Sequence, residues 1–238
     1  MEKTHATKSA VLIIYYSFSA QTASLVKSLA KGLAEGGTAV EKIRLSPTTP
    51  LRFPLRSLLL TFKMMLTTFF RKRVAIEEPA GIEQKPDLII LAGPTWSYNP
   101  SGPILFFLDR FGQKYLADRP VMPMISCRGY WRMHAAGLAR LLKRCGARPA
   151  APLIFTHPNP EPWRTIGVFL KITGRTPEKS RFLKKHYPRF GHSHEQINRA
   201  EGYGKFLAET LQEEGVAPAC RRLAELVNKE RASFMTHD

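Results

Sequence analysis

Hydroxyl side chains crowd a short stretch near the N-terminus, between a run of aliphatic residues and a helical pattern. Ser17, Ser19 and Thr22 belong to the sequence YYSFSAQT, which follows AVLII and precedes ASLVKSLAKGLAEGG. Backbone N–H groups at the start of a helix and the positive end of its dipole can bind a phosphate, and nearby hydroxyl groups can complete the site. A serine here can also be an ordinary N-cap. The stretch alone leaves both interpretations open.

Two later segments place small and aromatic residues directly after apolar runs. They read GPTWSYNPSGPI and SCRGYWRM. Trp96 and Tyr98 in the first segment could cover a flat ring system, or they could pack against a neighbouring helix. Cys127 could be a reactive thiol beside Arg128, although an isolated cysteine is more often a small buried residue. These segments gain meaning only if the fold brings them to the hydroxyl stretch.

Five short apolar runs, each bounded by turn residues, predict the strands that would bring these segments together. They span residues 10–16, 38–45, 87–93, 120–126 and 151–156, and helical patterns occupy 21–35, 102–113, 131–146 and 195–214. Several runs are apolar on both faces, as buried parallel strands must be. The alternation predicts a doubly wound α/β fold, with five parallel strands in the order 2-1-3-4-5 and helices on both faces. Ligands bind beyond the carboxyl ends of such strands, where all three segments would meet.

Positive charge is concentrated in particular segments of the 238-residue chain, whose formal net charge is +17. Residues 46–73 and 128–148 carry six basic residues each and no acidic one, and residues 161–194 carry eight basic and two acidic residues. Such a field favours anionic partners, which include phosphates, acidic lipids and acidic proteins. No nucleic-acid-binding motif accompanies the charge, so nucleic acid is not expected as a partner.

Three segments fall outside the minimal alternation of strands and helices. Residues 46–83 predict a basic insert with an amphipathic helix, whose apolar stripe contains Leu55, Leu58, Leu59, Phe62, Leu66 and Phe69. We expect this stripe to pack on the domain, the commonest fate of such stripes, while a membrane contact, a lid or a homodimer contact stay open as alternatives. Residues 157–194 form a second basic insert, rich in prolines and aromatic residues, and residues 216–238 predict a peripheral C-terminal helix.

Histidines and cysteines give weaker indications. His192 and His194 are expected to be exposed or to neighbour the N-cap of the last core helix, whereas His134 is the better candidate to approach a ring. The three cysteines fit no metal-binding spacing, so no metal site is predicted, and their odd number suggests a reducing compartment. With no signal-peptide pattern and no transmembrane run, the expected location is cytoplasmic, with peripheral contact at the inner membrane surface as an option.

Taken together, the three segments resemble the ligand-binding loops of flavodoxins over roughly residues 9–156 and 195–214. The first resembles the flavodoxin phosphate loop, usually [ST]-x-[ST]-G-x-T, with Ala20 in place of the common glycine. GPTWSYNPSGPI resembles the loop whose aromatic residue flanks the flavin ring. The resemblance implies a single flavodoxin-like domain over residues 1–238 that binds FMN through three groups of residues: Ser17, Ser19, Ala20, Gln21 and Thr22 at the phosphate, Pro94, Thr95, Trp96, Ser97, Tyr98 and Asn99 on one side of the ring, and Cys127, Arg128, Gly129 and Tyr130 on the other.

A narrower resemblance concerns the third segment. Cys127, Arg128 and Trp131 match the pattern [IV]-x-C-R-x-x-W of a flavodoxin-like family related to dialkylresorcinol-condensing enzymes. This resemblance implies FMN binding and a redox or aromatising role on a polyketide-like ring. A positive group near the pyrimidine end of a flavin would favour its anionic reduced form, so Arg128 is the candidate for this role, while a surface salt bridge stays open as its alternative. The leading hypothesis is therefore an FMN-dependent oxidoreductase for a hydrophobic substrate, which the inserts would contact. The alternative is an electron carrier that docks an acidic redox partner or a membrane surface through its basic inserts. No catalytic residue is predicted.

Overall fold

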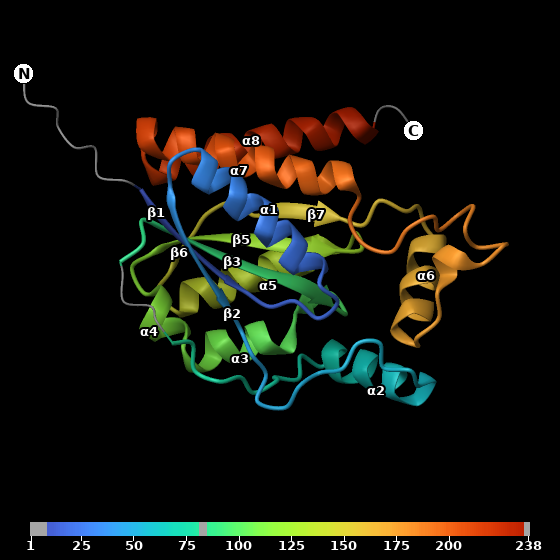
Figure 1. Ribbon diagram of the computed structural model, residues 1–238. Coiled ribbons are helices and arrows are strands. Elements are labelled where there is room, and N and C mark those ends of the chain that lie inside the picture. Colours follow the sequence, from blue (N-terminus) through green and yellow to red (C-terminus); the bar gives the residue numbers. More distant parts are fainter. Residues whose placement is uncertain (1–8, 81–84, 236–238) are drawn as a thin grey trace, which may run out of the picture.

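A central parallel sheet organises the computed structural model, which describes residues 9–80 and 85–235 (Figure 1). Its main strands follow the order β2-β1-β3-β5-β6, and β7 also pairs with β5. A short β4 pairs with β3 in antiparallel fashion. The strands are β1 (Ala10–Tyr15), β2 (Ala39–Arg44), β3 (Leu88–Trp96), β4 (Asn99–Pro100), β5 (Pro120–Cys127), β6 (Arg148–Pro149) and β7 (Leu153–Thr156). The predicted order 2-1-3-4-5 is confirmed.

The fifth predicted strand differs in one respect, because it is divided into β6 and β7. Both pieces pair with β5, at Arg148–Pro149 and at Leu153–Thr156. Pro149 and Pro152 lie in and just after the first piece. Proline has no backbone N–H to give to a ladder, so two prolines three residues apart interrupt the pairing. Together with β4, this division gives a seven-stranded sheet.

Helices cover both faces of the sheet, as predicted (Figure 1). One face carries α1 (Gln21–Glu35), α7 (His194–Glu214) and α8 (Val216–Met235), and the other carries α3 (Gly102–Arg110), α4 (Gly112–Leu116) and α5 (Trp131–Arg144). Alternate strand residues point to opposite faces, so Val11 and Ile13 join one hydrophobic core while Leu12 and Ile14 join the other. The helix predicted over 102–113 is two helices, divided at Phe111.

The first insert runs from β2 to β3 and contains α2 (Leu58–Phe69). Ser57 caps α2 by accepting a hydrogen bond from the Leu60 N–H. The expectation that the apolar stripe of α2 packs on the domain is wrong, because its buried residues are Thr61 and Thr68 and its leucines and phenylalanines are exposed. Residues 81–83 of this insert lie outside the described residues.

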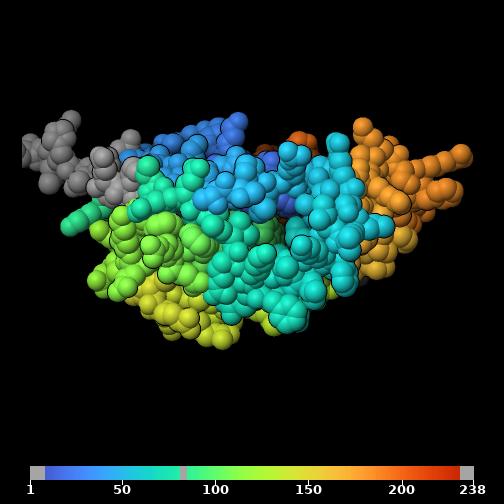
Figure 2. Space-filling model, turned by 90° about the horizontal axis from the view of Figure 1, so that it is seen from below, coloured from blue at the N-terminus to red at the C-terminus, as the bar shows by residue number. Residues whose placement is uncertain are grey.

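The second insert runs from β7 to α7 and contains α6 (Trp163–Ile172) and a short 3-10 helix (Pro177–Lys179). The sequence pattern did not predict α6, because this segment mixes prolines with aromatic and basic residues and so suggested irregular structure. The two inserts contact each other, since the Leu55 N–H donates to the Ile172 carbonyl at 2.8 Å and the ring of Phe53 stacks on that of Phe190. Both lie beyond the carboxyl ends of the strands, and Figure 2 shows α2 in cyan at the molecular surface beside the orange second insert.

The C-terminal helix α8 packs along α7 (Figure 1). Its Ala219, Cys220, Leu223 and Val227 are buried in the core on that side of the sheet. Residues 236–238 of the predicted helix fall outside the described part. Among the helices that the structure describes, none has the length and apolar character needed to cross a bilayer.

Candidate functional site

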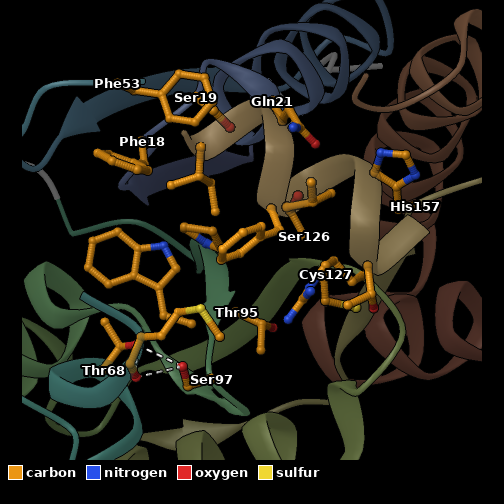
Figure 3. A pocket seen from close by; sticks show the side chains of 18 of the residues that line it. Phe18, Ser19, Gln21, Phe53, Thr68, Thr95, Ser97, Ser126, Cys127 and His157 are labelled. Carbon is orange, nitrogen blue, oxygen red and sulfur yellow. Dashed lines mark hydrogen bonds between the residues drawn. The ribbon is translucent and has the colours of Figure 1, made fainter. Parts of the chain in front are cut away.

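A cavity of about 360 Å³ lies at the carboxyl end of the sheet (Figure 3). Such a volume falls within the range of small-molecule and cofactor sites. The segments after β1, β3 and β5 all contribute to its lining, and both inserts complete its walls. The predicted site residues among its lining are Ser19, Gln21, Thr22, Pro94, Thr95, Trp96, Ser97, Cys127 and Arg128. The other six, Ser17, Ala20, Tyr98, Asn99, Gly129 and Tyr130, do not line it.

The segment after β1 presents the start of α1 to the cavity. Ser17 is buried and its Oγ accepts the N–H of Ala23 at 3.2 Å, so its hydroxyl serves the first turn of the helix. Ala20 occupies the N-cap position without a side chain that could accept a hydrogen bond. Within the described residues, the backbone N–H groups of Gln21 and Thr22 have no acceptor. They remain available, with the positive end of the dipole, to an anion.

Two hydroxyl groups stand beside these free N–H groups. Thr22 is almost fully buried, yet it lines the cavity together with Ser19. Within the described part of the chain, neither hydroxyl has a hydrogen-bond partner among the protein groups. Neither oxygen is among the buried side-chain atoms that lack a partner, so both hydroxyl groups are accessible to a ligand or to water. The donor set therefore suits a phosphate, whose oxygens accept from both N–H and O–H.

Ala20 lies in the left-handed region of backbone space, with φ at 63°. A Cβ in this region clashes with the following carbonyl and costs roughly 1–2 kcal/mol, a cost that glycine does not have. This explains physically why the motif that the segment resembles has glycine at this position.

Replacing Ala20 with glycine is expected to raise the free energy of unfolding by up to about 1 kcal/mol, because the relieved strain exceeds glycine's added unfolded-state entropy. The matched control is Ala34→Gly, on an exposed position in the last turn of the same helix. It is expected to lower the unfolding free energy by about 0.5–1 kcal/mol. Urea denaturation of the two variants measures both values, and an equal loss in both would contradict the strain at Ala20.

The segment after β3 forms a tight hairpin against α2. Trp96 pairs with Asn99, and the two residues between them, Ser97 and Tyr98, both have positive φ, of 43° and 69°. This is the pattern of a type I′ turn. The amide of Asn99 donates to the carbonyls of Thr68 and Phe69 at the end of α2, and the Ser97 and Thr68 hydroxyls lie 2.8 Å apart. Asn99 therefore joins the hairpin to α2 by hydrogen bonds and does not line the cavity.

Aromatic rings hold Trp96 in place at the cavity. Tyr16 and Phe18 contact its ring edge-on, at centroid distances of 5.7 and 5.5 Å. Tyr98 turns away from the cavity and meets Tyr130 in an edge-on pair at 5.3 Å. Of the aromatic residues that the sequence suggested for a ring site, the structure thus brings Trp96 to the cavity and pairs the two tyrosines outside its lining.

The segment after β5 contributes Ser126, Cys127 and Arg128 to the lining. Gly129 follows with φ at 153°, a backbone conformation that residues with a Cβ rarely adopt, which explains the glycine. Arg128 has no acidic partner within the described residues, and the cavity lining includes no aspartate or glutamate. The electrostatics of the cavity therefore favour an anionic ligand.

Both inserts supply cavity residues that were not among the predicted site residues. They are Phe53, Met64, Met65 and Thr68 from the first insert, and His157, Thr165, Ile166, Val168, Phe169, Leu170, Ile172 and Phe190 from the second. Figure 3 shows Phe53 and Phe18 on one side of the cavity, with Cys127 and His157 on another. Apolar residues at helical spacing in residues 163–172 were the sequence signal that could have predicted α6, which forms part of the cavity wall. Phe18 and Ser126 lie within the segments YYSFSAQT and SCRGYWRM, but they were not among the predicted site residues.

Three buried histidines are hydrogen-bonded around the cavity. His134 Nδ1 lies 2.7 Å from the Thr95 hydroxyl, and burial lowers the pKa of His134 to about 3. Burial, with smaller contributions from the His192 and Arg164 charges, lowers the pKa of His157 to about 4. Burial also lowers the pKa of His192 to about 4, so all three are neutral near pH 7. His134 does not line the cavity itself but contacts Thr95, which does, so its approach to a ring stays a prediction. Of the two alternatives expected for His192, exposure is excluded because the residue is buried.

His192 orients the hydroxyl of Ser126. Gln196 donates its amide N–H to the Thr156 carbonyl, which leaves its oxygen to accept from His192 Nδ1 at 3.2 Å. Nε2 of a neutral His192 is then an acceptor, and it lies 2.8 Å from Ser126 Oγ. The Ser126 hydroxyl therefore donates a hydrogen bond to His192 Nε2 and presents its oxygen lone pairs to the cavity. His192 also neighbours Ser193, the N-cap of α7, as predicted.

The free energy of unfolding is expected to fall as the pH drops from about 6.5 to about 4. The pKa of histidine in an unfolded chain is near its ordinary value of 6.5, whereas burial lowers the pKa of His192 to about 4. Between these values the unfolded chain holds more protons, so each such histidine removes about 1.4 kcal/mol of stability per pH unit. His192→Gln should flatten this dependence measurably in urea titrations across the range.

The control for this experiment is His194→Gln, which changes an exposed residue at the start of α7. It is expected to keep the pH profile of the wild type. If His192→Gln showed the same slope as the wild type, His192 would not be the buried neutral group described above.

No protein-family model matches the sequence. No curated protein matches it either. Solved structures do match: a protein from Bacteroides eggerthii described as a flavoprotein is 15% identical with a TM-score of 0.51, over 63% of this chain and 90% of that chain. A flavoprotein in complex with FMN from Lactobacillus acidophilus is 20% identical, over 62% and 93% of the two chains, with a TM-score of 0.48.

A flavodoxin from the domain Archaea is 10% identical, over 85% of this chain and 99% of that chain, with a TM-score of 0.45. The strand order β2-β1-β3-β5-β6 is that of the flavodoxin-like sheet, whose ligand site lies at the switch point between the first and third strands. The cavity lies at this switch point, beside the segments that follow β1 and β3. The chain therefore has a flavodoxin-like α/β fold, with two inserts that wall the cavity.

Proposed function

We propose that this protein binds FMN in the cavity and acts as an oxidoreductase on a hydrophobic substrate. The observation that carries the proposal is the start of α1. A helix N-terminus whose first two N–H groups have no acceptor within the described residues, with the hydroxyls of Ser19 and Thr22 beside it, opens into an aromatic-lined cavity at the switch point of a flavodoxin-like sheet. These are the requirements of a phosphate joined to a flat ring system.

Each part of the cavity has a role in this proposal. The N–H groups of Gln21 and Thr22, with the Thr22 hydroxyl, bind the phosphate, and Trp96 covers part of the ring. Ser126, whose proton is engaged by His192, accepts an N–H of the ring. Arg128 offsets negative charge on the ligand, since the lining contains no carboxylate. When bound, FMN supplies the hydride and electron transfer chemistry, and the protein positions and tunes it.

The inserts support an enzyme over a simple electron carrier. A carrier needs the edge of its cofactor at the surface, whereas here Met64, Phe169 and Ile172 are among the apolar side chains that wall the cavity. Such walls favour an apolar, ring-bearing substrate, for which an aromatic or polyketide-like molecule is the proposed class. An electron carrier docking an acidic protein would instead lose its partner reaction steeply with salt, so salt-insensitive turnover of an apolar substrate would favour the enzyme.

Titration of the purified protein with FMN tests the proposal directly. Binding is expected to quench flavin fluorescence and to shift the visible spectrum. Riboflavin, which has the same ring and no phosphate, is the matched ligand, and it should bind at least about tenfold more weakly because it loses charge-assisted hydrogen bonds. Absence of quenching with both ligands would exclude a flavin site. Equal affinity for both would exclude a phosphate site at α1.

A further inference from the structure

The exposed large apolar side chains are confined to one end of the molecule. Fourteen are exposed among the residues whose side chains the structure describes, and nine of them fall between Leu51 and Phe70 in the first insert. The other five are Tyr98, Tyr130, Met133, Ile166 and Phe182, in the second insert and at the ends of β3 and β5. All therefore belong to the end of the sheet where the cavity opens. A concentration of exposed apolar side chains at one end of a molecule marks an interaction surface.

Helix α2 is turned with its hydroxyl-bearing face inward and its apolar face outward. Thr61 and Thr68 are buried, whereas Leu59 is 76% exposed, Phe62 64% and Phe70 72%. Hydrogen bonds at both ends of the helix fix this orientation. Ser57 caps the helix, and Asn99 and Ser97 bind its last turn through hydrogen bonds. The fold therefore holds the apolar face of α2 toward the outside.

Basic residues surround this face, and acidic residues do not offset them. Residues 46–73 contain no aspartate or glutamate. In the neighbouring second insert, the two acidic residues Glu161 and Glu178 are each paired within the insert, with Arg164 and Lys171. The exposed cations that form no ion pair within the described residues include Arg52, Arg56, Lys63, Lys72, Arg175, Lys179, Arg181, Lys184 and Lys185. This end of the molecule is thus apolar at its centre and positive around it.

We propose that this end docks on the surface of an anionic membrane, with the apolar face of α2 inserted at the boundary between head groups and acyl chains. A surface helix with leucines and phenylalanines on one face and lysines and arginines around it has the composition of an interfacial helix. Anionic head groups complement the positive rim, to which each basic residue near the surface adds. A second copy of this chain fits less well, because a symmetric contact would bring two equally positive rims together.

Docking would place the entrance of the cavity beside the lipid. Met65 is 42% exposed and also lines the cavity, so the same helix forms both the docking face and a cavity wall. Ile166 has the same double role in α6. An apolar ligand dissolved in the membrane would then reach the cavity without crossing water. Docking itself does not depend on flavin binding and is tested without it.

Co-sedimentation with lipid vesicles tests this proposal. The full-length protein is incubated with phosphatidylcholine vesicles, with and without phosphatidylglycerol, and the bound fraction is measured. The expected result is binding to the anionic vesicles that is at least about tenfold stronger than to the neutral ones and that weakens as salt is added. The double variant Leu59→Ser/Phe62→Ser should lower binding at least about tenfold, because both side chains are exposed and would enter the bilayer.

Charge variants separate docking from nonspecific attraction of a basic protein. Arg52→Gln/Lys72→Gln, at the rim of α2, should lower binding about tenfold or more. Lys27→Gln/Lys205→Gln removes the same charge from exposed positions on α1 and α7, across the sheet, and should leave binding unchanged. Equal losses in the two charge variants would overturn the proposal. So would self-association in sedimentation equilibrium that Leu59→Ser/Phe62→Ser abolishes, with no vesicle binding by the wild type.

Discussion

Replacing Thr22 with valine is expected to weaken FMN binding by about ten- to a hundredfold. Valine has nearly the same shape, so the change removes the hydroxyl and little else. A hydrogen bond from a hydroxyl to a charged phosphate contributes about 1.5–3 kcal/mol, which corresponds to this range of affinities. Fluorescence quenching gives the dissociation constants for FMN and for riboflavin. The affinity for riboflavin is expected to stay close to that of the wild type, since that ligand has no phosphate.

Thr38 is a second buried threonine next to α1, and its substitution offers a matched control. It follows the other end of α1, is buried, and within the described residues its hydroxyl has no hydrogen-bond partner. Thr38→Val should leave FMN affinity unchanged and raise the free energy of unfolding by about 1 kcal/mol, because it removes an unsatisfied buried hydroxyl. If Thr22→Val bound FMN as tightly as Thr38→Val does, Thr22 would not contact the phosphate, and the segment after β1 would be only a helix cap.

Replacing Gly204 with alanine is expected to lower the free energy of unfolding by about 3 kcal/mol. Helices α1 and α7 approach so closely that a Cβ on Gly204 would lie 2.2 Å from the carbonyl oxygen of Leu29. That oxygen belongs to the backbone of α1 and cannot rotate away, so the helices themselves must move. For a chain of this length, the melting temperature should fall by roughly 10 °C.

Gly202 provides the control, two residues earlier on the same helix. It is exposed, and a Cβ there would meet nothing within 4 Å. Gly202→Ala is expected to raise the free energy of unfolding by about 0.5–1 kcal/mol, because alanine is the better helix former. Thermal melts of both variants give the comparison. Equal stability in the two would mean that α1 and α7 do not pack at the distance described.

The strands and core helices could be predicted because a strand or helix that packs in a core needs apolar residues at the spacing of its buried positions. In β1, successive residues alternate between two hydrophobic cores, and all of them must be apolar. The same pattern predicted where each strand ends, and hence that the segments after β1, β3 and β5 meet. Nine of the fifteen predicted site residues line the cavity as a result. Whether those residues bind FMN is still a prediction, which the titrations above test.

The inserts could be predicted only in part. Periodicity placed a helix near residues 58–69, but it does not tell which way an amphipathic helix faces. Amphipathic helices usually bury their apolar face, so burial of the leucines and phenylalanines of α2 was expected. The structure buries Thr61 and Thr68 instead. Ser126 and His192 are 66 residues apart in the chain, and nothing local indicates that they share a hydrogen bond.

By itself, the sequence determined the α/β architecture, the strand order, the position of the cavity at the carboxyl end of the sheet, and the helix start that can receive a phosphate. These follow from local hydrophobic period and from the rules of parallel sheets, both of which are written in short windows of sequence. The tertiary structure alone decided the left-handed backbone at Ala20, the outward face of α2, the walls that both inserts give the cavity, and the buried histidines that orient its hydroxyls. These features depend on contacts between residues far apart in the chain, and no local pattern specifies such contacts.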